Sequence, residues 1–86
     1  VQNALIDDAM ASKRQGQTTA ALDSLEALIQ RYPQSPLRET AEAERMRLLA
    51  STHSERAPEA ARAYLARYPK GFATADATSI LQALQP

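Results

Sequence analysis

A three-residue segment that occurs twice constrains the fold of this 86-residue chain more than any other feature. Arg31-Tyr32-Pro33 recurs 36 positions later as Arg67-Tyr68-Pro69. The same shift aligns identical residues elsewhere in the chain, namely Met10 with Met46, Ala21 with Ala57, Ala27 with Ala63, Ala41 with Ala77 and Leu48 with Leu84. A period of about 20 to 50 residues is typical of stacked supersecondary units that complete their cores against one another. The sequence therefore predicts an array of two and a half repeats with a period of 36.

The residue types within each repeat favour helices over strands. Alanine, leucine, arginine, glutamate and glutamine, all strong helix formers, fill much of the chain, whereas aromatic residues make up only 5% of it. Hydrophobic residues reach 44%, an ordinary fraction for a globular protein, and 86 residues is the size of one small domain. We therefore predict a single all-α domain over residues 1–86.

Local start and stop signals divide the chain into five expected helices. Gly16 ends the first, and Thr18 is expected to cap the second. Pro33 and Pro69 end the second and fourth, because the residue before a proline is pushed away from helical dihedrals. Ser35-Pro36 opens the third with suitable N-cap and N1 residues. The expected helices cover about 2–15, 19–32, 36–51, 58–68 and 73–84. Their short connections predict antiparallel α-hairpins.

Apolar residues recur at helical spacing in each segment and predict the core. The expected core consists of Leu5, Ala9, Ala21, Leu22, Leu25, Leu28, Ile29, Tyr32, Leu37, Ala41, Leu48, Leu49, Ala61, Tyr64, Leu65, Tyr68, Ala77, Ile80, Leu81 and Leu84. Because no polar helix caps the array, Ile80, Leu81 and Leu84 are expected to leave apolar surface on the last helix. Another copy of the chain or a missing domain would cover that surface.

The charge balance argues against two classes of partner. Ten basic and ten acidic residues cancel, whereas nucleic-acid binding draws on an excess of Lys and Arg. No apolar run approaches the length of about 20 residues that spans a bilayer, so this segment is not expected to insert into a membrane. The chain begins at Val1 and not at methionine, and we therefore expect it to be a fragment of a longer protein.

No set of residues has the composition of a catalytic or metal site. His53 is the only histidine, and there is no cysteine, whereas zinc usually needs three or four converging ligands. Asp7 and Asp8 are adjacent and therefore point about 100° apart on a helix. Gly16 and Gly71 are isolated, so no phosphate-binding loop is present. We expect neither an enzyme nor a bound cofactor.

The repeat resembles the tetratricopeptide family. With Pro33 as the repeat-ending proline, Gly16 lies where the family usually places its turn glycine. Ala21 and Leu25 match the small and large apolar positions of the family's second helix, and Leu5 matches the large position of its first. The period departs from the family's usual period of about 34 residues. The resemblance implies an α-hairpin solenoid that presents a binding groove.

The helix ends resemble, more narrowly, the divergent repeats of bacterial envelope proteins. Gln30-Arg31-Tyr32-Pro33-Gln34-Ser35-Pro36-Leu37 and Tyr64–Ala73 are similar to turns in the Tol–Pal-associated periplasmic coordinator, the barrel-assembly lipoprotein and the periplasmic tails of anti-sigma regulators. This resemblance implies a scaffold in the periplasm or cell envelope, and a cytoplasmic location stays open as an alternative.

The tetratricopeptide resemblance also implies a site on the first helix of each pair, which lines the concave face of such arrays. The positions that correspond to the groove are Asn3, Ile6, Met10, Lys13, Glu39, Glu42, Met46, Leu49, Thr78 and Gln82. Methionine suits adaptable binding surfaces but also fills cores. We therefore expect a non-catalytic adaptor that binds a protein or peptide in this groove. The alternative is a structural domain that self-associates, as a homo-oligomer, or packs against a missing domain.

Overall fold

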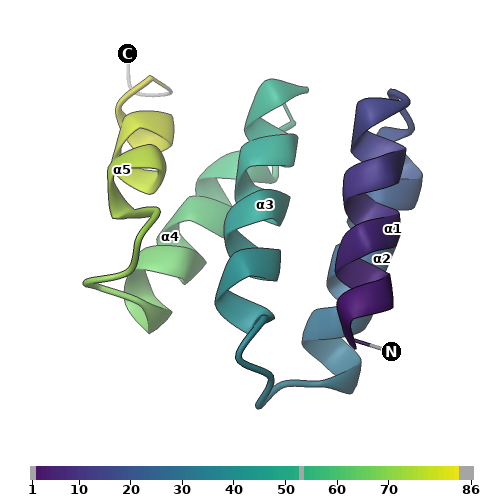
Figure 1. The fold of residues 1–86 in the computed structure, drawn as a ribbon. Coiled ribbons are helices and arrows are strands. Elements are labelled where there is room, and N and C mark those ends of the chain that lie inside the picture. The colour runs from purple at the N-terminus through teal and green to yellow at the C-terminus, as the bar shows by residue number, and fades with distance from the viewer. Residues whose placement is uncertain (1, 53, 84–86) are drawn as a thin grey trace.

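The computed structural model of the protein describes residues 2–52 and 54–83, with side chains from Ala4 onward. The helices are α1 (Gln2–Arg14), α2 (Thr18–Arg31), α3 (Arg38–Ser51), α4 (Ala57–Arg67) and α5 (Thr74–Ala83). Successive helices run antiparallel, and α2 and α4 lie behind the layer formed by α1, α3 and α5 (Figure 1). The described residues contain no strand. The prediction of an all-α chain with five helices is therefore confirmed.

The turns that follow the two Arg-Tyr-Pro segments have the same backbone structure. Tyr32 ends α2 at φ −131° and ψ 61°, and Tyr68 ends α4 at φ −128° and ψ 67°. The N–H of Ser35 donates to the carbonyl of Tyr32 at 2.9 Å, and the N–H of Gly71 donates to the carbonyl of Tyr68 at 3.0 Å. The 36-residue repeat of the sequence is thus also a repeat of the turn that connects one hairpin to the next.

The capping signals of two helices act differently from the prediction. The N–H of Leu37 donates to the Ser35 hydroxyl at 3.0 Å, as an N-cap bond would, but this first turn is too tight to be α-helical and α3 begins at Arg38 rather than Pro36. The expected Thr18 cap is wrong, because α2 begins at Thr18 itself, after Gln17. Gly16 ends α1 at φ +76°, as predicted for a helix-terminating glycine.

The core has two parts, and α3 contributes to both. Between α1, α2 and α3 it contains Ala9, Ala21, Leu25, Leu28, Ala41 and Leu48. Between α3, α4 and α5 it contains Ala43, Met46, Leu49, Ala57, Ala60, Ala61, Tyr64, Ala73 and Ala77. Most of these side chains are alanines, which let the helices approach closely but bury few methylene groups. A chain of this size therefore has a thin margin of stability.

The volumes at two pairs of equivalent core positions compensate for each other. Leu28 on α2 corresponds to Tyr64 on α4, and Leu37 corresponds to Ala73. The second repeat thus has a larger residue on the helix and a smaller one at the turn. Both Tyr64 and Ala73 are 1% exposed, so the tyrosine occupies the space that the alanine leaves.

Candidate functional site

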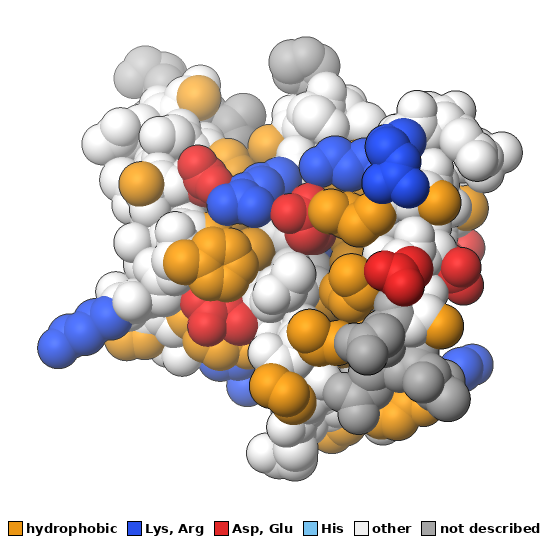
Figure 2. All heavy atoms as spheres, viewed as in Figure 1, with side chains coloured by type: hydrophobic (Ala, Val, Ile, Leu, Met, Phe, Trp, Pro, Cys, Tyr) orange, Lys and Arg blue, Asp and Glu red, His pale blue; other side chains and the backbone are white. Residues whose placement is uncertain are grey.

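Phe72, in the turn before α5, has an unusual position for an aromatic side chain. It is 62% exposed and is the only large hydrophobic side chain so exposed among those the structure describes. It lies beside the face formed by α1, α3 and α5, which is the face seen in Figures 1 and 2. A single exposed hydrophobic residue is common on protein surfaces, so its significance depends on what surrounds it.

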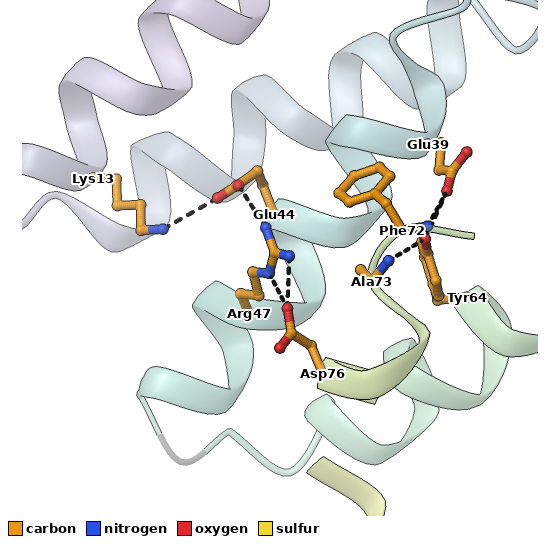
Figure 3. A network of polar contacts seen from close by, with 8 residues as sticks. All are labelled: Lys13, Glu39, Glu44, Arg47, Tyr64, Phe72, Ala73 and Asp76. Atoms are coloured by element: carbon orange, nitrogen blue, oxygen red, sulfur yellow. Dashed lines mark hydrogen bonds and ion pairs between the residues drawn. The ribbon is translucent and has the colours of Figure 1, made fainter. Parts of the chain in front are cut away.

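Three contacts hold Phe72 in place (Figure 3). Its backbone N–H donates to Oε2 of Glu39 at 3.2 Å. Its ring meets the Tyr64 ring edge-on, with centroids 6.5 Å apart, and the guanidinium carbon of Arg47 lies 5.7 Å from its centroid. An exposed aromatic ring that is already ordered loses little conformational entropy when a partner binds.

Tyr64 supports this turn from the core. Its hydroxyl donates to Oε2 of Glu39 at 2.7 Å and accepts a hydrogen bond from the N–H of Ala73 at 3.0 Å. Burial raises the pKa of Tyr64 above 10.0, and the hydrogen bond to the Glu39 carboxylate raises it further. The hydroxyl therefore stays protonated at neutral pH and links α3 to the start of α5.

A chain of ion pairs crosses the same face from α1 to α5. Lys13 pairs with Glu44 at 3.1 Å, Glu44 pairs with Arg47 at 3.1 Å, and Arg47 pairs with Asp76 at 2.6 Å. Figure 3 shows these four side chains in a row, and Figure 2 shows acidic and basic side chains alternating in a band across this face, with hydrophobic side chains beside it. Burial would lower the pKa of Arg47, but Asp76 and Glu44 outweigh that effect and raise it. Partly exposed pairs add little stability, so their main effect is to fix the position of Arg47.

A shallow hollow of about 320 Å³ lies between α3 and α5, next to this band. Its lining residues are Arg47, Ala50, Asp76, Ser79 and Ile80. Because Arg47 lines this hollow and also lies over the Phe72 ring, the two form one continuous surface. That surface offers an apolar hollow and an aromatic ring on either side of a fixed guanidinium.

The predicted groove residues do not all lie on this surface. Ile6 and Met10 are half-buried on α1, and Lys13, Thr78 and Gln82 are exposed. Met46 and Leu49 are 0% and 2% exposed, and so cannot contact a partner. Glu39 and Glu42 are half-buried and accept hydrogen bonds from Tyr64 and Tyr68. The Asn3 side chain lies outside the described part of the chain.

The burial of Met46 and Leu49 corrects the expected site and has a physical reason. These two residues face α4 and α5, because α3 is packed on both sides. On the α1, α3 and α5 face, α3 contributes Glu44 and Arg47 to the chain of ion pairs, and the groove positions missed both. Phe72 was also missed, although the 36-residue register places it opposite Pro36 and outside the predicted core, which is a usable signal.

The other features expected from the sequence have mixed outcomes. Ile80 and Leu81 are half-buried and pack partly against the core between α3, α4 and α5, so part of each side chain stays exposed on α5. Leu84 and His53 lie outside the described residues. Within the part that the structure describes, no three His, Cys, Asp or Glu side chains converge to hold a metal ion. None of the described helices has the length and apolarity needed to cross a membrane.

Comparisons with known proteins add no relative: no family model, curated protein or solved structure matches this chain.

Proposed function

We propose that this chain is a non-enzymatic interaction module that binds an extended peptide segment of a partner protein across the α1, α3 and α5 face. The observation that carries the proposal is Phe72, an aromatic ring that is 62% exposed yet fixed by Glu39, Tyr64 and Arg47. Interface hot spots are enriched in aromatic and arginine side chains, and here the two are in contact.

The surface around Phe72 defines the chemistry of the segment that fits it. The hollow lined by Ala50 and Ile80 accepts one apolar side chain, and the Phe72 ring supports a second. Between them, Arg47 and Asp76 offer a guanidinium and a carboxylate to the polar groups of a peptide backbone. A segment with two apolar side chains that flank a polar stretch satisfies all three features.

The compartment we propose is the bacterial periplasm or cell envelope. This part of the proposal depends on the resemblance of the two Tyr-Pro turns to the repeats of envelope scaffolds. The alternative function is self-association, in which a second copy covers Phe72 and the half-buried Ile80 and Leu81.

Selection from a displayed random peptide library, followed by affinity measurement, tests the proposal. Peptides selected on the native chain should bind Phe72→Ala about thirtyfold more weakly, the loss expected when a hot spot worth about 2 kcal/mol is removed. Arg62→Ala is the control, because Arg62 is exposed on α4 and makes no ion pair within the described residues. Peptides that bind Phe72→Ala and the native chain equally well would refute the site.

Light scattering distinguishes self-association from peptide binding. Self-association predicts a molar mass that rises towards a dimer with concentration, and Phe72→Ala should then restore the monomer. A native chain that stays monomeric while it binds the selected peptides supports the interaction module instead.

A further inference from the structure

A second surface, formed by α2, α3, α4 and the turns beside them, contains two clusters of arginine and glutamate. In the first, Oε2 of Glu26 accepts hydrogen bonds from Arg45 at 3.0 Å and from Arg56 at 2.8 Å. These three residues come from α2, α3 and the turn before α4. They line a hollow of about 350 Å³ together with Ile29, Gln30 and Glu42.

The second cluster surrounds Glu42. Its carboxylate lies 3.4 Å from Nε of Arg38 and 3.6 Å from Nε of Arg67, and it accepts a hydrogen bond from the Tyr68 hydroxyl at 2.7 Å. Arg38, Arg67 and Tyr68 line a second hollow of about 310 Å³, together with Pro33, Gln34 and Ser35. Glu42 lines the first hollow and pairs with two arginines of the second, so the two hollows are neighbours. We refer to the two hollows together as the cationic groove.

The charges of this groove do not cancel. Arg38, Arg45, Arg56 and Arg67 face Glu26 and Glu42, which leaves a surplus of two positive charges in a chain whose formal net charge is zero. The glutamates are also more covered than the outer arginines. The Glu26 and Glu42 side chains are 30% and 15% exposed, whereas those of Arg56 and Arg67 are 53% and 51% exposed. A partner therefore meets guanidinium groups first.

The glutamates hold the arginines in place without exhausting their hydrogen-bonding capacity. A guanidinium has five N–H donors. Within the described residues, the Arg56 guanidinium uses one nitrogen for a hydrogen bond, which it donates to Glu26. Burial alone would raise the pKa of Glu26, but hydrogen bonds from Arg45 and Arg56 outweigh it and lower the pKa below 4.5. The carboxylate thus remains charged at neutral pH and keeps the two guanidiniums side by side.

We propose that the cationic groove binds an acidic peptide segment, whose carboxylates pair with the guanidinium N–H groups of Arg56 and Arg67. Arginine suits this task because its planar guanidinium can bind a carboxylate through two parallel hydrogen bonds. The surplus is only two charges, and Glu26 and Glu42 lie beside the arginines. Two discrete carboxylates can be placed at Arg56 and Arg67 and away from both glutamates, whereas the closely spaced phosphates of a nucleic acid would also lie against Glu26 and Glu42. The groove uses none of the residues around Phe72, so this inference is independent of the proposed function.

Fluorescence anisotropy with a defined probe tests the groove. The probe is a fluorescein-labelled decapeptide with four glutamates in a glycine–serine background, and its counterpart has glutamine in their place. The glutamate peptide should bind the native 86-residue chain at about 50 mM NaCl and weaken severalfold at about 300 mM, where charges are screened over shorter distances. The glutamine peptide should bind at least about tenfold more weakly.

Two double variants that remove the same charge locate the site. Arg56→Gln with Arg67→Gln should weaken binding of the glutamate peptide about tenfold or more. Arg62→Gln with Lys70→Gln should change it less than about threefold, because both residues are exposed and line neither hollow. Circular dichroism of each variant should show the native helix content, since none of the four side chains is buried.

Three results would overturn the inference. The first is that the native chain does not bind the glutamate peptide in preference to the glutamine peptide. The second is an equal loss of affinity in both double variants, which would indicate general attraction to charge. The third is tighter binding of a single-stranded decanucleotide than of the glutamate peptide, which would assign the groove to a nucleic acid.

Discussion

Replacement of Tyr64 by phenylalanine removes one hydroxyl and leaves the ring in the core between α3, α4 and α5. The hydroxyl makes two hydrogen bonds, one as donor to Glu39 at 2.7 Å and one as acceptor from the N–H of Ala73 at 3.0 Å. The two partners differ in their access to water. Glu39 is half-buried and also binds the Phe72 N–H, whereas Ala73 is 1% exposed. The substitution therefore leaves the buried N–H of Ala73 without its hydrogen-bond acceptor.

The size of the effect follows from these two environments. A buried donor without a partner costs about 1–3 kcal/mol, and loss of a hydrogen bond to a charged acceptor costs about 1.5–3 kcal/mol. Water can replace the lost donor at Glu39, so the lower end of the second range applies. We expect Tyr64→Phe to lower the free energy of unfolding by about 3 kcal/mol, a large part of the stability of a domain this small.

Tyr68→Phe is the matched control. The Tyr68 ring lies 5.1 Å from the Tyr64 ring, and its hydroxyl makes one described hydrogen bond, to Glu42. Glu42 keeps Arg38 and Arg67 as partners after the change, and no backbone donor is stranded. We expect this variant to lose about 1.5 kcal/mol, the lower end of the range for a bond to a charged acceptor.

Urea unfolding followed by circular dichroism at 222 nm measures both variants. With an m-value of about 1 kcal/mol per molar urea, the midpoint should fall by about 3 M for Tyr64→Phe and about 1.5 M for Tyr68→Phe. Equal losses for the two variants would refute the reasoning, because the stranded Ala73 N–H is the main difference between them.

Two further predictions follow from the same region. A Cβ on Gly71 would overlap the Tyr64 hydroxyl and the Glu39 carboxylate and lie 2.9 Å from Cβ of Tyr68. Gly71→Ala should therefore lower the free energy of unfolding, measured with heat or urea, by about 1–3 kcal/mol. The loss should be smaller in the Tyr64→Phe background, where the hydroxyl is absent. An equal loss in both backgrounds would contradict the overlap. Burial and the hydrogen bond to Glu42 raise the pKa of Tyr68 from 10.0 to about 12. The folded chain holds this proton more tightly than the unfolded chain, so the stabilisation is complete below pH 10 and is lost as the pH rises towards 12. Urea unfolding between pH 9 and pH 12 measures the effect. The free energy of unfolding should fall less steeply with pH for Tyr68→Phe than for the native chain.

The helices and the turns between hairpins could be predicted from the sequence because their signals are local. Pro33 and Pro69 block the helical dihedrals of the residue before them, and Gly16 supplies a positive φ. The start of α3 was harder, because Ser35 caps a tight turn before the α-helix begins at Arg38. Capping chemistry identifies the turn but not the type of helix that follows it.

The candidate site was harder to predict because it depends on which faces of α3 are covered. Met46 and Met10 are equivalent in the repeat, yet Met46 is buried and Met10 is half-buried. The difference arises because α4 and α5 both pack on the Met46 side of α3. The contacts of Phe72 also escape sequence analysis, because Glu39 and Arg47 are far from it along the chain.

The position of α3 in both parts of the core has a consequence for communication between the two proposed surfaces. Arg45 and Arg47 are two residues apart on α3, but one pairs with Glu26 in the cationic groove and the other with Asp76 beside Phe72. A ligand on either surface therefore stabilises the same helix. A ligand that binds only the folded chain raises the free energy of unfolding, and it therefore also keeps the other ligand's binding surface folded. One helix thus joins the two faces into a single thermodynamic unit.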